Sequence, residues 1–157
     1  MNSPFREIVQ FELDGQSYGL PAAQVEQVVP AVPPARLPRT PSIIEGVVNL
    51  HGAIVPLLDI RARFRLQPKP VGVGDLMIVA KAVGRRVAIR ADRVIGLVEL
   101  RNGDIHAAKA VFPTENHILD IATLPGGVVL LHDLDHFLTR AESEMLDGAM
   151  AQPEATS

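Results

Sequence analysis

Apolar and polar residues alternate along short stretches of this chain, and turn-forming residues separate the stretches. Residues 8–13 alternate in this way, which indicates a half-buried strand. Asp14-Gly15 follows and predicts a type I′ hairpin, because both central residues of that turn need a positive φ. Residues 17–20 are the expected return strand, so the sequence predicts a β-hairpin near the N-terminus.

The most informative stretch is a pair of apolar runs, residues 44–50 and 54–60, joined at the turn His51-Gly52. Short apolar runs between turn residues are typical of buried strands. Pro56 lies within the second run and predicts an edge position or a bulge, because proline has no N–H to donate. The polar residues near the strand ends are Asn49, His51 and Asp59. Such a hairpin suits a chain that presents a surface to another protein.

The segments around this hairpin are predicted from their prolines and apolar spacing. Residues 21–25 indicate a short helical turn. Its apolar side would carry Val25, Val28 and Val29. Residues 30–41 contain five prolines, which favours a stiff connecting loop. Further strands are expected over residues 76–83, 86–91, 94–100, 118–123 and 127–131, with turns at Gly84-Arg85 and Pro125-Gly126 and a break at Gly96.

The end of the chain follows a different pattern. Thr139 and Glu142 have the spacing of a capping box, in which each side chain accepts a hydrogen bond from the backbone N–H of the other. A helix of about ten residues should follow, since apolar residues then recur at helical spacing. Together with about nine or ten short strands, this helix predicts a mainly β protein built as small barrels or a sandwich.

Composition limits the classes of function. The chain has 157 residues, a net charge of −3 and 4% aromatic residues, which argues against nucleic-acid binding. Arg61, Arg63 and Arg65 form a local basic cluster that we expect on a solvated strand-to-loop face. The chain has no cysteine, and we find neither a signal-peptide pattern nor an apolar run long enough to span a membrane. We therefore expect a cytoplasmic protein without membrane insertion.

Candidate catalytic groups are few. The segment from His132 to His136 contains two imidazoles and two carboxylates, a set that can bind a metal. His132, however, should end a strand and Asp133 should cap a helical turn, so we expect capping and surface polar roles. His51 is a possible base without a partner nucleophile nearby, and Asp59 should accept backbone N–H groups of the next turn. We predict no catalytic residues, no metal site and no cofactor.

Several segments, taken in order, resemble the CheW-like adaptor domain of bacterial chemosensory systems. They are Tyr18-Gly-Leu-Pro21, Val25-Glu-Gln-Val28, Leu37-Pro38, Gly46-Val-Val-Asn-Leu-His-Gly52, Val55-Pro-Leu-Leu-Asp-Ile60 and Val129-Leu-Leu-His-Asp-Leu134. The resemblance implies two intertwined five-stranded SH3-like barrels, to which the sequence adds a short C-terminal helix. It implies one domain of two β subdomains over residues 5–150, and residues 151–157 would form a disordered tail.

The resemblance also implies a function without catalysis. Proteins of this family couple chemoreceptor cytoplasmic tips to the regulatory domain of a CheA-type histidine kinase. By position, the residues that match places near partner contacts or the strand-turn-strand signature are Val25, Gln27, Val28, Gly46, Asn49, His51 and Gly52. The family commonly has arginine where this chain has His51, and an imidazole is shorter and changes charge near neutral pH.

Three other readings remain open from the sequence. The departure at His51 is compatible with a divergent scaffold for a non-motility pathway, or with partial loss of the interface. A small-ligand-binding barrel would need a pocket of several hundred cubic ångströms, with converging polar groups, between its subdomains. A metal-dependent hydrolase would need the residues of the His132–His136 segment to converge.

Overall fold

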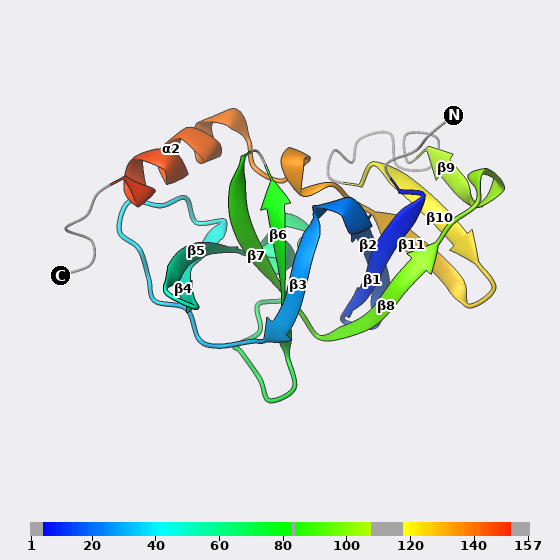
Figure 1. The fold of residues 1–157 in the computed structure, drawn as a ribbon, viewed down its shortest axis with the longest axis horizontal. Helices are drawn as coiled ribbons and strands as arrows, with labels where there is room; N and C mark the ends of the chain where they lie inside the picture. Colours follow the sequence, from blue (N-terminus) through cyan, green and yellow to red (C-terminus); the bar gives the residue numbers. More distant parts are fainter. Residues whose placement is uncertain (1–4, 83, 108–117, 152–157) are drawn as a thin grey trace.

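The computed structural model describes residues 5–82, 84–107 and 118–151, and it contains two β-sheets that lie side by side (Figure 1). The first sheet has the strand order β8-β1-β2-β11-β10-β9, and the second has the order β3-β6-β7-β5-β4. The strands of the first sheet are β1 (Glu7–Leu13), β2 (Gln16–Pro21), β8 (Arg93–Glu99), β9 (Ile105–Ala107), β10 (Asp120–Leu124) and β11 (Gly127–Leu131). Those of the second are β3 (Val25–Pro30), β4 (Ile44–Leu50), β5 (Ala53–Leu58), β6 (Leu76–Ala82) and β7 (Arg85–Ala91).

The predicted mainly β fold is confirmed, with the short strand β9 as a sixth member of the first sheet. The chain is intertwined because it leaves the first sheet after β2, forms the whole second sheet with β3 to β7, and returns with β8. Each sheet contains one parallel pair, β2 with β11 and β5 with β7. The first sheet is therefore completed only by strands from both ends of the domain.

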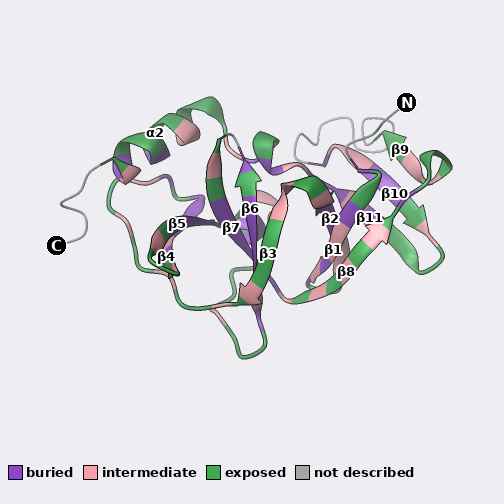
Figure 2. Ribbon diagram, viewed as in Figure 1, coloured by how far each residue is buried: buried purple, intermediate pink, exposed green. Residues whose placement is uncertain are grey.

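A shared hydrophobic core joins the two sheets. It contains Phe11 and Tyr18 from the first sheet and Ile78 and Ile89 from the second, all buried. Two smaller clusters lie on the other faces, one with Ile8 and Leu131 as members and one with Val55 and Met77 as members. Figure 2 shows the buried residues concentrated in the central strands, whereas β3 and β8 are mostly exposed or half-buried.

The hairpin turns form where the sequence predicts them. Asp14 and Gly15 have φ values of 52° and 81°, and His51 and Gly52 have 53° and 89°. Positive φ at both central residues is the type I′ pattern, whose twist matches that of the flanking strands. The turn predicted at Gly84-Arg85 is wrong at Arg85, which already begins β7.

The predicted helical turn at residues 21–25 is wrong at its end. A 3₁₀ turn covers only Ala22–Gln24, and Val25 begins the strand β3, which pairs with β6. Val25, Val28 and Val29 therefore lie along a strand. β-Branched residues fit a pleated strand better than a helix when a partner strand is available.

The second run of the central hairpin is also shorter than predicted. β5 ends at Leu58, and Ile60–Arg63 forms the helix α1. Asp59 caps this helix by accepting the Ala62 N–H at 3.0 Å, as the sequence predicts for that carboxylate. Pro56 is not on an edge strand, because β5 lies between β4 and β7. The ladder between β5 and β7 begins only at Leu57, so the missing N–H of Pro56 does not interrupt that pairing.

The C-terminal helix is confirmed as α2 (Arg140–Met150). The Thr139 hydroxyl accepts the Glu142 N–H at 3.1 Å, and the Glu142 carboxylate accepts the Thr139 N–H at 2.9 Å. Leu146 and Ala149 are the buried residues of this helix. The tail predicted to be disordered over residues 151–157 is wrong at Ala151, which is the C-cap of α2, and residues 152–157 lie outside the described residues.

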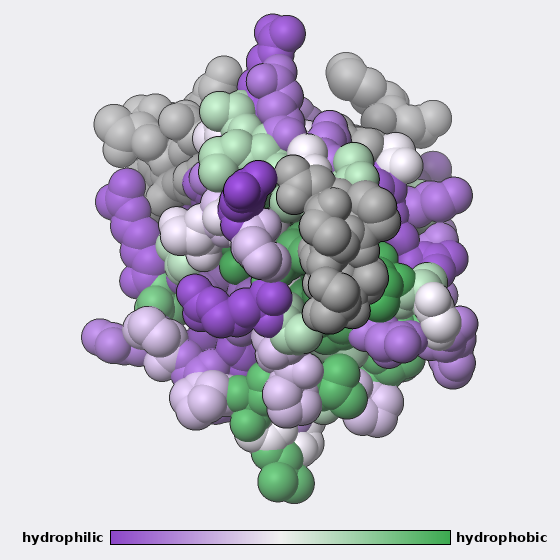
Figure 3. Space-filling view, turned by 90° about the vertical axis from the view of Figure 1, so that its left-hand side faces the viewer, coloured by the Kyte–Doolittle hydropathy of each residue, from purple (hydrophilic) through white to green (hydrophobic). Residues whose placement is uncertain are grey.

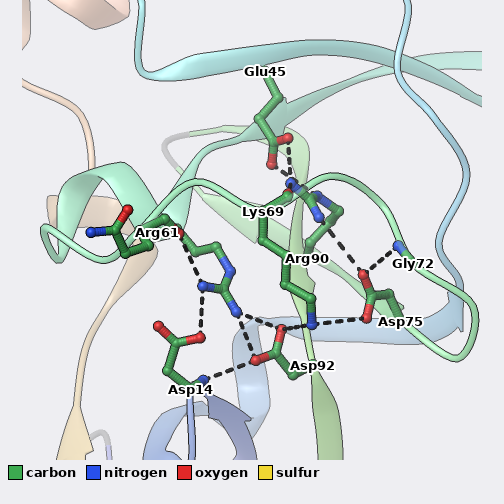
Figure 4. Close-up of polar contacts among 9 residues, drawn as sticks. Asp14, Glu45, Arg61, Lys69, Gly72, Asp75, Arg90 and Asp92 are labelled. Carbon is green, nitrogen blue, oxygen red and sulfur yellow. Dashed lines mark hydrogen bonds and ion pairs between the residues drawn. The ribbon is translucent and has the colours of Figure 1, made fainter.

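The prediction of a solvated basic cluster is wrong for Arg61 and Arg63, although Arg65 is exposed. Arg61 is only 5% exposed, and its guanidinium lies between two carboxylates (Figure 4). Its Nη2 donates to both Asp92 oxygens at 2.8 and 2.7 Å, and its Nη1 lies 2.8 Å from Asp14 Oδ1. Hydrogen bonds between two charged groups, as here, are shorter and stronger than those between neutral groups.

These contacts join the two sheets. Asp14 lies in the β1–β2 turn, Arg61 in α1 after β5, and Asp92 between β7 and β8. The Asp14 N–H also donates to Asp92 at 2.8 Å. Burial alone would raise the pKa of Asp92, but this backbone hydrogen bond, together with Arg61 and Lys69, outweighs it and holds the pKa below its ordinary value.

Two further arginines hold peripheral segments. Arg90 donates to Glu45 at 2.8 and 3.1 Å and to the Lys69 carbonyl at 2.7 Å, which fixes the loop before β6 (Figure 4). Arg63 donates to Glu142 at 2.5 Å and lies over the Phe137 ring at 5.2 Å. The basic side chains that follow β5 therefore stabilise the tertiary structure.

We expect Arg61→Met to lower the free energy of unfolding by about 3 kcal/mol at pH 7, because it leaves two carboxylates without their buried partner. The depressed pKa of Asp92 means that its ion-pair contribution is present above the ordinary carboxyl pKa of about 3.9 and is lost as the pH falls through the lower folded value. The difference between wild type and variant should therefore shrink below about pH 4. Urea unfolding measured across this range tests both expectations.

Arg140→Met is the control, because Arg140 forms an exposed pair with Glu144 at 3.3 Å. Such a pair contributes at most about 0.5 kcal/mol. Equal destabilisation by both substitutions would contradict the role assigned to Arg61.

Candidate partner-binding surface

The strand β3 presents the first group of predicted contact residues. β3 is an edge strand of the second sheet, and it pairs with β6 alone among the described strands. Gln27 and Val28 are exposed, and 39% of Val28 is accessible although it is a large apolar residue. Val25 is half-buried and packs against the shared core. β3 therefore offers a narrow apolar strip with a polar neighbour.

The β4–β5 turn presents the second group. Asn49, His51 and Gly52 are all exposed there. The Asn49 side-chain oxygen accepts the Gly52 N–H at 2.8 Å, so Asn49 holds the turn that projects His51. Figure 3 shows the end of the molecule that carries β4, β5 and α2, where apolar residues are interspersed with polar and charged ones.

Gly46 has a different position from the other predicted residues, since it is buried beneath the Pro-rich segment. Its φ is 154°, and a Cβ built on it would lie 2.3 Å from the Ala35 carbonyl oxygen. Ala35 and Val47 exchange two backbone hydrogen bonds, of 2.9 and 2.7 Å, beside this glycine. Gly46 therefore lets the segment after β3 pair with β4.

The two exposed groups do not share a ladder. β3 and β4 are the opposite edges of the second sheet in the hydrogen-bonding order, with β6, β7 and β5 between them. The Pro-rich segment links these edges through the Ala35–Val47 bridge. The predicted contact residues thus form two separate surfaces, on β3 and at the β4–β5 turn.

The sequence reasoning overlooked Ile54, which is 50% exposed on β5. Ile54 pairs with Asn49 in the register of the hairpin, so the two lie directly opposite each other beside the turn. Counting back from His51-Gly52 on both strands would have put them on one face. An apolar side chain next to an exposed polar turn is a typical composition for a contact surface.

The histidines of the segment from residue 132 to residue 136 have different environments. His132 is fully buried, with its ring edge-on to Phe64 and Phe137, which corrects the prediction of a surface role. His136 is exposed, and Asp133 caps the 3₁₀ turn Leu134–His136 as predicted. Within the described residues, no group of three or more His, Cys, Asp or Glu side chains is placed to hold a metal ion.

Two open hollows, of about 520 and 510 Å³, lie beside the Pro-rich segment. Both include Glu45 and Asp59, whose carboxylates already bind Arg90 and cap α1. None of the residues that line these two hollows comes from the first sheet. They are therefore not the cleft between subdomains that the small-ligand reading requires.

No helix in the described ranges is long and apolar enough to span a membrane.

Comparison with known proteins agrees with this geometry. The family model described as the CheW-like domain matches residues 7–142, which include both sheets and the start of α2. The chain belongs to the CheW-like domain family. The match begins at the first residue of β1 and includes β3, the Pro-rich segment and the β4–β5 turn.

Individual CheW proteins are similar along most of their length. The chain is 28% identical over 144 residues to the chemotaxis protein CheW of Klebsiella aerogenes, covering 90% of this chain and 87% of that protein. It is 32% identical over 102 residues to the CheW of Bacillus subtilis, covering 65% of each. The crystal structure of the scaffolding protein TtCheW from Thermoanaerobacter tengcongensis superposes with a TM-score of 0.80 at 26% identity, covering 90% and 97% of the two chains.

We expect Gly46→Ala to lower the free energy of unfolding by about 2–3 kcal/mol, because the new methyl group collides with the Ala35 carbonyl. Amide hydrogen exchange at Ala35 and Val47 should accelerate more than the global stability change explains, since their pairing is lost first.

Gly126→Ala provides the matched control, as a Cβ there would meet no atom within 4 Å. Its effect should stay within about 0.5 kcal/mol. A Gly46→Ala protein with wild-type stability and wild-type exchange would show that the close approach at Gly46 is unimportant.

Proposed function

We propose that this protein is a non-catalytic adaptor that couples chemoreceptors to a CheA-type histidine kinase in bacterial chemosensory signalling. The observation that carries the proposal is the match to the CheW-like domain along residues 7–142, with relatives named as chemotaxis proteins and a scaffolding protein. An adaptor works by contact, and this chain offers two exposed surfaces, on β3 and at the β4–β5 turn. The proposed working unit is the single domain of residues 5–150.

The proposed partners are the regulatory domain of the kinase and the cytoplasmic tip of a chemoreceptor. Val25, Gln27 and Val28 would contact one partner along β3. The turn with Asn49, His51 and Gly52 would contribute a second, separate contact, beneath which Gly46 holds the backbone in position. Two surfaces on opposite sheet edges suit a protein that must bind two partners at once. Both partner sites are cytoplasmic, and we assign the protein to that compartment within this proposal.

A role without catalysis is consistent with the chemistry of the exposed groups. The carboxylates near the hollows bind arginine or cap a helix, and His132 is buried among aromatic rings. His51 projects from a turn in which Asn49 is engaged with the backbone. The carboxylates and His132 serve the fold, so binding rests on the exposed side chains of the two surfaces, among them Gln27, Val28, His51 and Ile54.

We expect Val28→Asp to weaken binding to the kinase regulatory domain or the receptor tip at least tenfold, because a charge replaces an apolar contact. Isothermal calorimetry with each purified partner, taken from the gene cluster that encodes the chain, identifies which one uses β3. Folding of the variant should be unchanged, since Val28 is 39% exposed.

Val128→Asp is the matched control, because Val128 is similarly exposed but lies on β11 of the first sheet. It should bind both partners with wild-type affinity. If Val28→Asp binds both partners as tightly as wild type does, β3 is not a contact surface.

His51 gives a second expected outcome, which separates a standard adaptor from a divergent one. If the turn meets an acidic partner residue, His51→Arg should bind that partner roughly threefold more tightly than wild type, because arginine is permanently charged and reaches further than an imidazole. Isothermal calorimetry of the two proteins at one pH measures the difference. Equal affinity would favour a scaffold whose turn has lost its family contact.

A further inference from the structure

The strand β8 is an exposed edge of the first sheet. It ends the hydrogen-bonding order of the first sheet, and among the described strands it pairs only with β1. Its residues alternate between exposed and half-buried without interruption from Arg93 to Glu99. The register with β1 shifts at Ile95, which marks a β-bulge beside Gly96, and the exposed side chains still alternate on either side of it. β8 is thus an exposed template for pairing with another strand.

The sequence of β8, Arg-Val-Ile-Gly-Leu-Val-Glu, is chemically symmetric about Gly96. The two ends carry opposite charges, the next residues inward are both valine, and the central glycine is flanked by isoleucine and leucine. In an antiparallel pair centred on Gly96, Arg93 of one copy therefore faces Glu99 of the other, and this occurs twice. Ile95 faces Leu97 in the same way. A closed two-fold interface requires this kind of self-complementarity.

Exposure along β8 fits such a pairing. Ile95 and Leu97 are 42% and 66% exposed although both are large and apolar. Gly96 has a φ of 137°, and a Cβ built there would meet no atom within 4 Å, so the backbone at the centre is open to close approach. Large apolar side chains on an edge strand are normally avoided or covered.

The charges around β8 also favour a second copy of the chain as the partner of this strand. Glu99 lies opposite Glu7 in the β1–β8 ladder, and in the described part of the chain neither carboxylate has an ion-pair partner. Like charges directly opposite each other are destabilising. Arg93 is 71% exposed and lies 3.8 Å from Glu12, so its guanidinium is free to reach outward. A second copy would bring this arginine to the paired carboxylates.

We propose that two copies of this chain associate through antiparallel pairing of β8 with β8, centred on Gly96. The interface would extend the two six-stranded sheets into one continuous sheet, with Ile95 and Leu97 packed across the two-fold axis and an Arg93–Glu99 pair at each end. It leaves β3 and the β4–β5 turn exposed on both copies, so it is independent of the proposed partner contacts. A short edge-to-edge interface buries little area, so we expect weak, concentration-dependent dimerisation.

Sedimentation equilibrium of the full chain over a wide concentration range, combined with charge reversal, tests the proposal. Arg93→Glu and Glu99→Arg should each weaken dimerisation roughly tenfold, because two pairs per dimer become repulsive. The double variant restores complementarity and should recover wild-type affinity to within about threefold. Added salt should weaken the wild-type dimer, as exposed charges are screened.

Leu97→Lys is a second variant that should abolish the dimer, and Met145→Lys on α2 is its matched control with similar surface character. Circular dichroism verifies that each variant is folded. The proposal fails if the wild type stays monomeric up to about 1 mM, where an association of about 4 kcal/mol would be visible. It also fails if a dimer forms that Leu97→Lys does not disrupt, or if the double charge reversal remains as weak as the single ones.

Discussion

The buried guanidinium of Arg61 is the interaction that holds the two sheets in one arrangement. Its partners are Asp14 in the first hairpin turn and Asp92 at the crossing back to the first sheet, so three distant segments meet at one cation. A charge in such a place is tolerated only when it is fully paired, and here both carboxylates and the Gln67 carbonyl accept from it. The shared apolar core determines that the sheets associate, while this directional contact restricts how they do so.

The second constraint is the closure of the five-stranded sheet. The Pro-rich segment carries the chain from the edge β3 to the edge β4, and it reaches β4 only because Gly46 has no side chain. Proline cannot donate to a ladder, so Ala35 makes the only β-bridge that lies outside the named strands of the described chain. The same closure separates the two surfaces proposed for partners, and it keeps the β4–β5 turn projecting from a rigid base.

The parts of the fold that depend on local chemistry were predictable from the sequence. The turns at Asp14-Gly15 and His51-Gly52 both need positive φ, which their residue types allow. The capping box of Thr139 and Glu142 spans only four residues. The burial of Arg61 was not predictable from the sequence, because its partners are 31 and 47 positions away in the chain. The prediction of a helical turn leading into Val25–Pro30 was wrong for a related reason. A short valine-rich segment becomes a strand only when β6, about fifty residues later, is beside it. The exposed position of Ile54 was not predicted, but it could have been, because the register of the hairpin places Ile54 opposite Asn49.

The insertion of the second sheet between β2 and β8 has a consequence for synthesis of the chain. β2 pairs with β11, so Tyr18 meets its neighbour Leu130 only after more than a hundred further residues have left the ribosome. The strands β3 to β7 are complete much earlier and can form their ladders while the first hairpin still lacks half of its sheet. Such long-range pairing is slow and leaves unpaired edges in the nascent chain. During translation, the first hairpin therefore waits for β8 and β11 before its sheet can be completed.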